Sequence, residues 1–448
     1  MGARSGHDSR AWLEVDEGAP ARNLQALREH ARPPGGELPP VIAMVKADGY
    51  GIGIRHLVRG LALDALPPGG PATGEPPDAS YVLPPTGIVA LGVAALSEAR
   101  ELRELGIRCP ILLFSPVLPR EAGAVLDADV IPMVSELPFA RALAGEARRR
   151  GIRADFHVEV DTGIGRSGLP AREVEAWGPD LLSLCGVGSG AGEGRGEGDP
   201  ADGAAGDTPA GTAGGAAGDA PLRWAGLAHH FHSPDDAPGT MAAQEEAFAG
   251  VAAHLRRQGL AVPGEDGGEG LLVHRRSAAA AYREPARPRE AIRPGIILVG
   301  GRAAPDLPVP EPVVALRTRV VSIREVPPGA TVGYGATYRA ERRERWATLP
   351  VGYGDGLPRA LSNRGRVLLD GGEAPVVGRI SMDLVVVDIT DLPAVSVGDL
   401  VTVLGRHGEM EISLDEIAGH AGTISYEVLT GLGKRLPRVP LPSTPPAT

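Results

Sequence analysis

The sequence contains only two cysteines in 448 residues, Cys109 and Cys185. They lack the spacing of a metal site, and so sparse a pair in a long chain predicts reduced thiols rather than a disulfide scaffold. An excess of basic residues is also missing, because 45 Lys and Arg stand against 56 Asp and Glu, for a formal net charge of -11. Such a chain offers no electrostatic footprint for nucleic acid. We therefore expect neither a metal site nor a nucleic-acid partner.

Long apolar segments are missing as well. No stretch approaches the roughly 20 apolar residues that span a bilayer, and the opening MGARSGHDSRAW has no apolar signal-peptide core. Together with the reduced thiols, these absences predict a soluble, cytoplasmic protein with no membrane partner. The length is nevertheless sufficient for a large core and two domains.

Two segments have too few apolar residues to offset the entropy of ordering them. They are the low-complexity insertions near 65–80, ALPPGGPATGEPPDAS, and 186–221, which is almost entirely Gly, Ala, Asp, Pro and Thr. The second insertion is not a phosphate-binding loop, because no GK[ST] follows it. Both are predicted to be flexible surface loops.

The apolar residues between 41 and 300 form eight short runs. These runs are VIAMVKA, GIVALGV, PILLFSP, VIPMVS, DFHVEV, WAGLAHHF, GLLVH and IRPGIILVG, with amphipathic segments such as LSEARELRELGI between several of them. Eight alternating strand and helix units predict a closed parallel (β/α)8 barrel of the TIM type, whose active site lies at the carboxyl ends of the strands. We assign residues 17–300 to this barrel, with the insertions inside it.

Beyond residue 301 the pattern changes to alternating strands with Gly and Pro turns, such as VVALRTRVVSIREV and RVLLDGGEAPVVGRISMDLVVVDIT. This pattern predicts a mostly antiparallel β domain over 301–440, followed by a flexible tail over 441–448. The alternation of AWLEVDEG predicts a strand within residues 1–16, which we expect to pack with the β domain.

Polar residues recur at the predicted strand ends. Lys46 ends the run VIAMVKADGYGIG, and four others lie at later strands: Arg166, His230, Ser277 and Arg293. Desolvation lowers the pKa of a lysine, and a neutral amine bonds covalently to aldehydes such as pyridoxal phosphate. Alone, each residue has an ordinary structural explanation, such as a snorkelling lysine, a core histidine or a helix cap. Their shared position at one face of a barrel favours a functional site.

Several motifs resemble those of the alanine racemase family. They are VIAMVKADGYGIG, VDTGIGRSG, AIRPGI, TVGYGATY, LPVGYGDGLPR, VVGRISMDLVVVDIT and ISYEVLTGLGKRLPR, and their order and spacing match from about Trp12 to Arg438 apart from the insertions. The resemblance implies a pyridoxal-phosphate barrel followed by a β domain, working as a head-to-tail homodimer. It also implies that the enzyme interconverts L-alanine and D-alanine and supplies D-alanine for bacterial peptidoglycan.

The resemblance implies roles for three residues at the centre of the reaction. Lys46 would hold the cofactor and act as the base on one face of the substrate α-carbon. Tyr334, contributed by the second subunit, would be the base on the opposite face. Arg293 would bond the pyridine nitrogen; a guanidinium keeps its proton, so the ring withdraws electrons more weakly and the proton returns to the α-carbon.

The resemblance assigns supporting roles to the remaining motif residues. The groups expected to hold the phosphate are Tyr50, Ser277, Tyr426 and the backbone at Gly295 and Ile296. His230 would pack against the ring, and Arg166 would reach the phenolic oxygen and the substrate carboxylate. Tyr353 and Met382 of the second subunit would narrow the substrate pocket.

The chain departs from the family pattern at three places. Many members carry a carbamylated lysine beside the motif arginine, where this chain has Glu159, an anion that could orient Arg166 without carbon dioxide. The sequence reads HRRS where an asparagine usually precedes the serine, which we expect to place Arg276 near the phosphate. ILVGG lacks the tyrosine that usually precedes the glycine.

Four alternatives stay open at this point. A racemase for serine or another small amino acid would share all these motifs. A decarboxylase of the same architecture places an acidic residue at the ring nitrogen, whereas this chain has Arg293, and it carries a cysteine motif that is missing beyond Cys185. A non-catalytic cofactor carrier resembles a barrel alone. An inactive relative would not need Lys46 and Tyr334.

Overall fold

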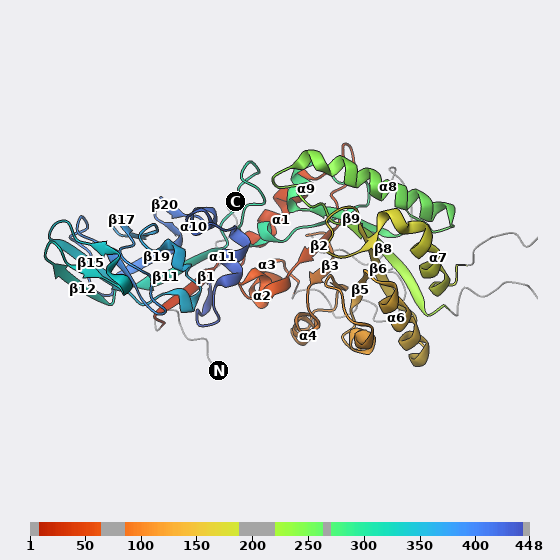
Figure 1. Ribbon diagram of the computed structural model, residues 1–448, viewed down its shortest axis with the longest axis horizontal. Helices are drawn as coiled ribbons and strands as arrows, with labels where there is room; N and C mark the ends of the chain where they lie inside the picture. The colour runs from red at the N-terminus through yellow and green to blue at the C-terminus, as the bar shows by residue number, and fades with distance from the viewer. Residues whose placement is uncertain (1–8, 64–85, 188–219, 263–269, 442–448) are drawn as a thin grey trace, which may run out of the picture.

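The computed structural model describes residues 9–63, 86–187, 220–262 and 270–441. Most of the two low-complexity insertions and nearly all of the C-terminal tail therefore lie outside the described residues. Figure 1 shows two lobes: a barrel built from the first two thirds of the chain and a β-rich lobe built mainly from the last third. Within the described residues, no helix is both long and apolar enough to cross a membrane.

Eight parallel strands close into a barrel. Each strand pairs with the next one around the ring, β5 pairs with β6, and the ring closes between β10 and β2. The strands are β2 (Val41–Met44), β3 (Ile88–Val93), β4 (Ile111–Leu113), β5 (Ile131–Val134), β6 (Ala154–Asp161), β8 (Leu222–His229), β9 (Leu272–Ser277) and β10 (Ala291–Arg293). The predicted barrel is confirmed, and each strand overlaps one of the apolar runs. The overlap is smallest for IRPGIILVG: only Ile292 and Arg293 belong to β10, and Ile296–Val299 forms a short 3-10 helix instead of continuing the strand.

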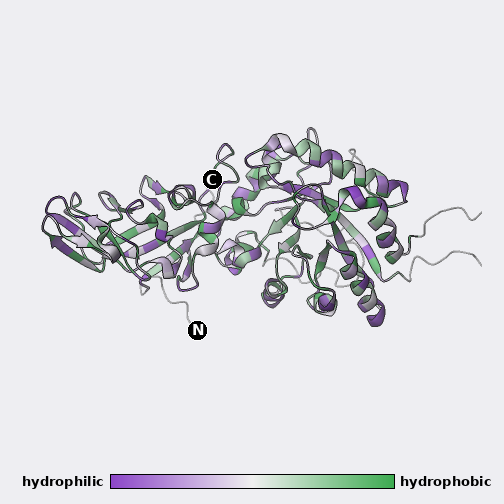
Figure 2. Cartoon of the chain, in the orientation of Figure 1, coloured by the Kyte–Doolittle hydropathy of each residue, from purple (hydrophilic) through white to green (hydrophobic). Residues whose placement is uncertain are grey.

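Helices surround the barrel and bury their apolar sides against it. Figure 2 shows apolar strands at the centre and polar patches on the outward sides of the helices. Most helices follow their strand, whereas α1 precedes the barrel and packs against α3, α9 and the short 3-10 helix η5 (Ile296–Val299). The helices are α1 (Ala19–His30), α3 (Ile54–Gly60), α4 (Leu96–Glu104), α5 (Ala122–Asp127), α6 (Leu137–Arg150), α7 (Val174–Leu184), α8 (Met241–Arg257) and α9 (Ala278–Arg283).

The second lobe contains two main sheets. The larger has the order β17-β16-β19-β11-β1-β21, with β20 on β19, and the smaller has the order β12-β15-β18. The larger sheet consists of β1 (Ala11–Val15), β11 (Val314–Arg319), β16 (Arg366–Leu369), β17 (Gly372–Pro375), β19 (Leu400–His407), β20 (Met410–Ile412) and β21 (Arg438–Pro440). The smaller sheet consists of β12 (Ser322–Val326), β15 (Glu344–Leu349) and β18 (Val385–Asp388), and a separate hairpin joins β13 (Thr331–Val332) to β14 (Tyr338–Arg339).

The strand β1 lies inside the larger sheet, antiparallel to β11 and parallel to β21. The chain therefore starts in the β domain, builds the barrel and returns. The β domain also contains two helices, α10 (Leu414–Ala421) and α11 (Ser425–Gly431). Helix α11 packs against α2 (Lys46–Tyr50), so the two lobes meet beside the carboxyl end of β2.

Candidate active site

Lys46 stands just past the end of the fully buried strand β2, where the backbone enters a left-handed turn. The φ angles of the next four residues are all positive: Ala47 at 53°, Asp48 at 52°, Gly49 at 61° and Tyr50 at 56°. Residues other than glycine rarely adopt this conformation, because Cβ crowds the following carbonyl. Burial and the nearby Arg166 and Arg293 charges lower the pKa of the Lys46 ammonium. The structure thus favours a neutral amine there, the form that bonds an aldehyde.

Arg293 lies buried at the end of β10, and its two terminal nitrogens are occupied by neighbouring strands. One donates to the carbonyls of His229 and Arg275, at 2.9 and 3.0 Å, and the other donates to the carbonyl of His274. Within the described chain, no protein acceptor meets the Nε–H group of Arg293. Burial lowers the pKa of Arg293 to about 10, so the guanidinium remains a charged donor at neutral pH. A ring nitrogen that needs one donor would fit this remaining N–H.

Two buried histidines form a chain behind Arg293. Nη1 of Arg293 lies 3.1 Å from Nδ1 of His274, and Nε2 of His274 lies 2.8 Å from Nδ1 of His157. Burial lowers the pKa of His157 to about 3 and that of His274 well below its ordinary value, so both rings are neutral. Because arginine only donates, His274 accepts at Nδ1 and carries its proton on Nε2, which it donates to His157.

The contact between the two histidines depends on Gly226. His157 of β6 is paired with Gly226 of β8, and β8 is paired in turn with β9, which carries His274. A Cβ atom at Gly226 would lie 2.2 Å from Nδ1 of His157. Because Gly226 has no side chain, the His157 ring can lie over β8 at this position and reach His274 on β9.

His230 lies on the other side of the Arg293 guanidinium. Its Nδ1 is 3.1 Å from Nη2 of Arg293. Burial lowers the pKa of His230 to about 3, and the charges of Arg293, Arg166 and Lys46 act in the same direction. Four of the five residues predicted at the strand ends, His230, Arg293, Arg166 and Lys46, therefore lie close enough together for their charges to interact.

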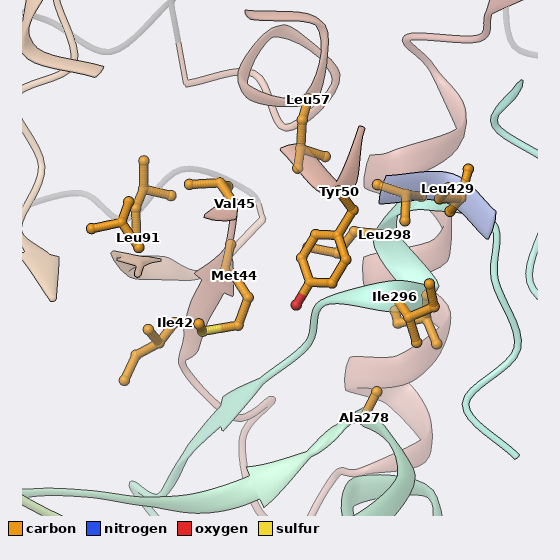
Figure 3. Close-up of a cluster of buried hydrophobic side chains, with 14 of the residues drawn as sticks. Ile42, Met44, Val45, Tyr50, Leu57, Leu91, Ala278, Ile296, Leu298 and Leu429 are labelled. Atoms are coloured by element: carbon orange, nitrogen blue, oxygen red, sulfur yellow. The ribbon is translucent and has the colours of Figure 1, made fainter. Parts of the chain in front are cut away.

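Hydroxyl groups and helix starts gather on the neighbouring side of the barrel mouth. The rings of Tyr50 and Tyr426 are 6.2 Å apart, and a Cβ at Gly295 would lie 2.2 Å from the Tyr50 hydroxyl oxygen. Figure 3 shows the Tyr50 ring in a cluster with Met44 of β2 and Ile296 of η5. Burial raises the pKa of Tyr50, and that of Tyr426 to about 12, so both hydroxyls keep their protons.

The N–H groups that open η5, beginning at Ile296, precede the first acceptor within that helix. Ser277 caps α9, because its hydroxyl accepts from the amide of Ala280 at 3.5 Å. Neutral hydroxyls and helix-opening N–H groups are the donors that bind phosphate groups. The donor set around Tyr50 therefore suits the phosphate of pyridoxal phosphate.

Comparison with known proteins identifies the family. Residues 76–189 match the alanine racemase N-terminal domain, and residues 313–440 match the alanine racemase C-terminal domain. The alanine racemase of Syntrophobacter fumaroxidans is 33% identical over 428 residues, which cover 95% of this chain and 96% of that protein. The chain belongs to the alanine racemase family.

Solved structures of alanine racemases share this fold. The enzyme from Streptomyces coelicolor A3(2) is 28% identical, with a TM-score of 0.76 over 97% of this chain and 99% of that chain. The alanine racemase from Bartonella henselae with covalently bound pyridoxal phosphate is 23% identical, with a TM-score of 0.71 over 97% and 100% of the two chains.

Glu159, which the sequence predicts to take the place of a carbamylated lysine, is held by two hydroxyl groups. Its Oε2 accepts from Ser167 at 2.8 Å and from Ser135 at 3.4 Å, whereas its Oε1 lies 3.9 Å from the guanidinium of Arg166. The Glu159 side chain is 9% exposed and that of Arg166 is 62% exposed. The buried Glu159 side chain is therefore held in place by the two serines and lies within ion-pair distance of the exposed Arg166 guanidinium.

We expect racemisation by this chain to be independent of carbon dioxide. Because the carboxylate of Glu159 is part of the chain and needs no carbon dioxide to form, stripping dissolved carbon dioxide should leave the rate unchanged, and bicarbonate should add nothing. Glu159→Gln, which keeps the size but removes the charge, should weaken the hold on Arg166 and lower kcat. The rates are measured in degassed and bicarbonate-supplemented buffer of equal pH and ionic strength. A rate that collapses on degassing and returns with bicarbonate would show that a lysine elsewhere is carbamylated.

Arg276 does not serve the phosphate as expected from the sequence. Its guanidinium donates to Glu290 at 2.8 Å and to Glu284 at 3.1 Å, and lies 3.4 Å from Glu245. Arg275 binds Glu290 and Glu245 as well. Burying a charge is costly unless it is paired, and these three carboxylates draw Arg276 into an ion-pair network. The expectation for Arg276 was therefore wrong.

Three predicted residues lie on the surface of the β domain rather than at the barrel mouth. The exposed fractions are 70% for Tyr334, 52% for Met382 and 42% for Tyr353. Among the described residues, no hydrogen bond or ion pair joins Tyr334 to Lys46 or Arg293. The described residues of a single chain thus bring Lys46 and Arg293 into one region but leave Tyr334 outside it.

Sequence reasoning missed two features of this site. The His157–His274 contact gives no sequence signal, because 117 residues separate the two histidines. Glu98 of α4 was also missed, although it lies close enough to Lys46 to affect its pKa.

Proposed function

We propose that the chain is a pyridoxal-phosphate-dependent racemase that interconverts L-alanine and D-alanine. One observation carries this proposal: Lys46, with its lowered pKa, faces a buried Arg293 whose remaining N–H group suits a pyridine nitrogen. Membership of the alanine racemase family supports the same reaction and substrate. A product of this kind would supply D-alanine for bacterial peptidoglycan.

The cofactor, when bound, makes the α-hydrogen of an amino acid acidic. Lys46 would hold it covalently at rest and, once released, would remove or return the proton at the α-carbon from one face. Tyr334 would act on the opposite face, since inversion needs a proton acceptor on one side and a donor on the other. Arg293 would keep its proton and hydrogen-bond the ring nitrogen, which limits electron withdrawal and favours return of the proton to the α-carbon.

The remaining residues would bind and orient. Tyr50, Tyr426, Ser277 and the backbone at Gly295 and Ile296 would hold the phosphate through neutral O–H and N–H donors. His230 would pack against the ring. Arg166, oriented by Glu159, would bind the phenolic oxygen and the substrate carboxylate.

We further propose a homodimer that works in the cytoplasm. The exposure of Tyr334, Tyr353 and Met382 on the β domain supports a dimer, because a second subunit could carry them over the barrel mouth. Large exposed apolar side chains are typical of such contacts. The two cysteines, Cys109 and Cys185, are free and buried, which is consistent with a reducing compartment.

Incubation of the cofactor-loaded protein with L-alanine in D2O tests the reaction. We expect optical rotation to decay to zero while deuterium replaces the α-hydrogen, since each inversion passes the proton through exchangeable groups. L-Serine, run in parallel, should react more slowly, and Lys46→Ala protein should exchange the α-hydrogen far more slowly than the wild type. Release of carbon dioxide without racemisation would identify a decarboxylase, and faster turnover of serine would change the substrate.

A further inference from the structure

A single carboxylate joins the loop after β2 to the loop after β3. Oε1 of Glu98 accepts from the amide of Ala47 at 2.6 Å. Its Oε2 accepts from the amides of Ala94 and Ala95, at 2.8 and 3.1 Å. Glu98 stands in the first turn of α4, so its own backbone is fixed by the helix that it caps. The side chain therefore fixes the backbone of the residue that follows Lys46.

The segment that Glu98 holds needs external support. Five successive residues with positive φ, three of them not glycine, run from Ala47 to Gly51. Each such residue other than glycine adds a strain that the surrounding structure must offset. Asp48 contributes by accepting from the amide of Ile54 at 2.9 Å, and Arg438 donates to the carbonyl of Gly51 at 2.6 Å. Of these three contacts, the one made by Glu98 to Ala47 is the nearest to Lys46 in the sequence.

We propose that Glu98 is a positioning residue for the lysine: by binding the Ala47 amide, it holds the left-handed turn that aims the Lys46 side chain into the barrel mouth. This inference rests on the proposed function of Lys46. Glu98 itself touches neither substrate nor cofactor in this role, and it acts through the backbone.

Electrostatics agree with this placement. The negative charge of Glu98 raises the pKa of Lys46, against the larger lowering by burial and by Arg166. The same charge adds to the rise in the pKa of Tyr50, at the far end of the turn. Glu98 therefore lies close to both ends of the segment that it is proposed to hold.

The test compares Glu98→Ala and Glu98→Gln with Glu104→Ala and Glu104→Gln in the full-length, cofactor-loaded protein. Glu104 is an exposed acidic residue at the end of the same helix, so these controls match the change in charge and composition. Two quantities are measured: amide hydrogen exchange at Ala47, and kcat and KM for alanine. Exchange reports the hydrogen bond itself, independently of activity.

We expect Glu98→Ala to speed amide exchange at Ala47 by roughly tenfold or more, because the amide loses one charge-assisted hydrogen bond and each tenfold corresponds to about 1.4 kcal/mol. Its kcat should fall by roughly 10- to 100-fold with little change in KM, because a displaced base affects the reaction more than binding. Glu98→Gln keeps a single acceptor oxygen and should be intermediate in both quantities. The Glu104 variants should match the wild type.

Unchanged exchange at Ala47 in Glu98→Ala would overturn the proposal, and so would faster exchange with an unchanged kcat. If Glu98→Ala does not fold, the test relies on Glu98→Gln. Wild-type exchange at Ala47 and wild-type kcat in that variant would overturn the proposal. If the wild type shows no racemisation, the proposed function fails separately. Exchange at Ala47 and the rate of cofactor release, read from visible absorbance, then still decide whether Glu98 holds the turn.

Discussion

Lys46→Ala protein is expected to lose the visible absorbance of a lysine-bound cofactor and to racemise alanine roughly 10²–10⁴-fold more slowly, the usual effect of removing a general base. The reason is the position of Lys46 at the end of β2, where burial lowers the pKa of its amine. Absorption spectra and polarimetry measure the two effects. A pyridoxyl group that borohydride reduction fixes on a different lysine would contradict the assignment.

The same variant makes the proposed dimer testable. Tyr334→Phe dimers should also be nearly inactive, because every site lacks the second base. Mixing the two variants under subunit exchange gives about half mixed dimers, each with one site that carries both lesions and one that carries neither. Activity should therefore return to about a quarter of the wild type. If mass spectrometry shows exchange while activity stays at background, Tyr334 does not act across an interface.

Gly226→Ala is expected to destabilise the barrel and to lower activity together. The new Cβ would lie 2.2 Å from Nδ1 of His157, a distance that no relaxed structure tolerates. Overpacking of this kind costs about 1–3 kcal/mol of the free energy of unfolding. The displaced His157 would release His274 and, through it, the buried Arg293. Thermal unfolding and kcat measure the two effects.

A double-variant cycle separates the clash from other causes. His157→Ala removes the ring that the new Cβ meets, so adding Gly226→Ala to it should cost far less than it does alone. Gly145→Ala in α6 is the matched control, because a Cβ there meets nothing within 4 Å and alanine favours a helix. Wild-type stability in Gly226→Ala would mean that β8 shifts freely and that the histidine contact is not fixed by the glycine.

The barrel was predictable because its strands are buried on both faces and carry continuous apolar runs. The run VIAM, for example, is buried at all four positions of β2. Lys46, His230 and Arg293 were predictable for the same reason, since the ends of parallel strands converge at one face. The helices α10 and α11 were not anticipated inside a β domain, because their short segments lie among strands and glycines.

Contacts across the barrel were beyond sequence reasoning. The left-handed turn at Ala47 and Asp48 uses residues that normally avoid positive φ, so local preference pointed away from it. Glu98 supports that turn from a helix 51 residues away. Arg276 was misplaced because the sequence does not show that Glu290, Glu284 and Glu245 converge on it.

The position of β1 between β11 and β21 has a consequence for synthesis on the ribosome. Glu14 of β1 forms an ion pair with Arg317 of β11, and 303 residues separate the two. At ~5–20 residues per second, the nascent β1 waits roughly 15–60 seconds for that partner. Within the barrel, by contrast, β2 can pair with β3 well before β10 is made, so only the closing contact between β2 and β10 waits as long. A half-made chain therefore displays β1, with the side chains of Leu13 and Val15, as an open edge that other nascent chains could pair with.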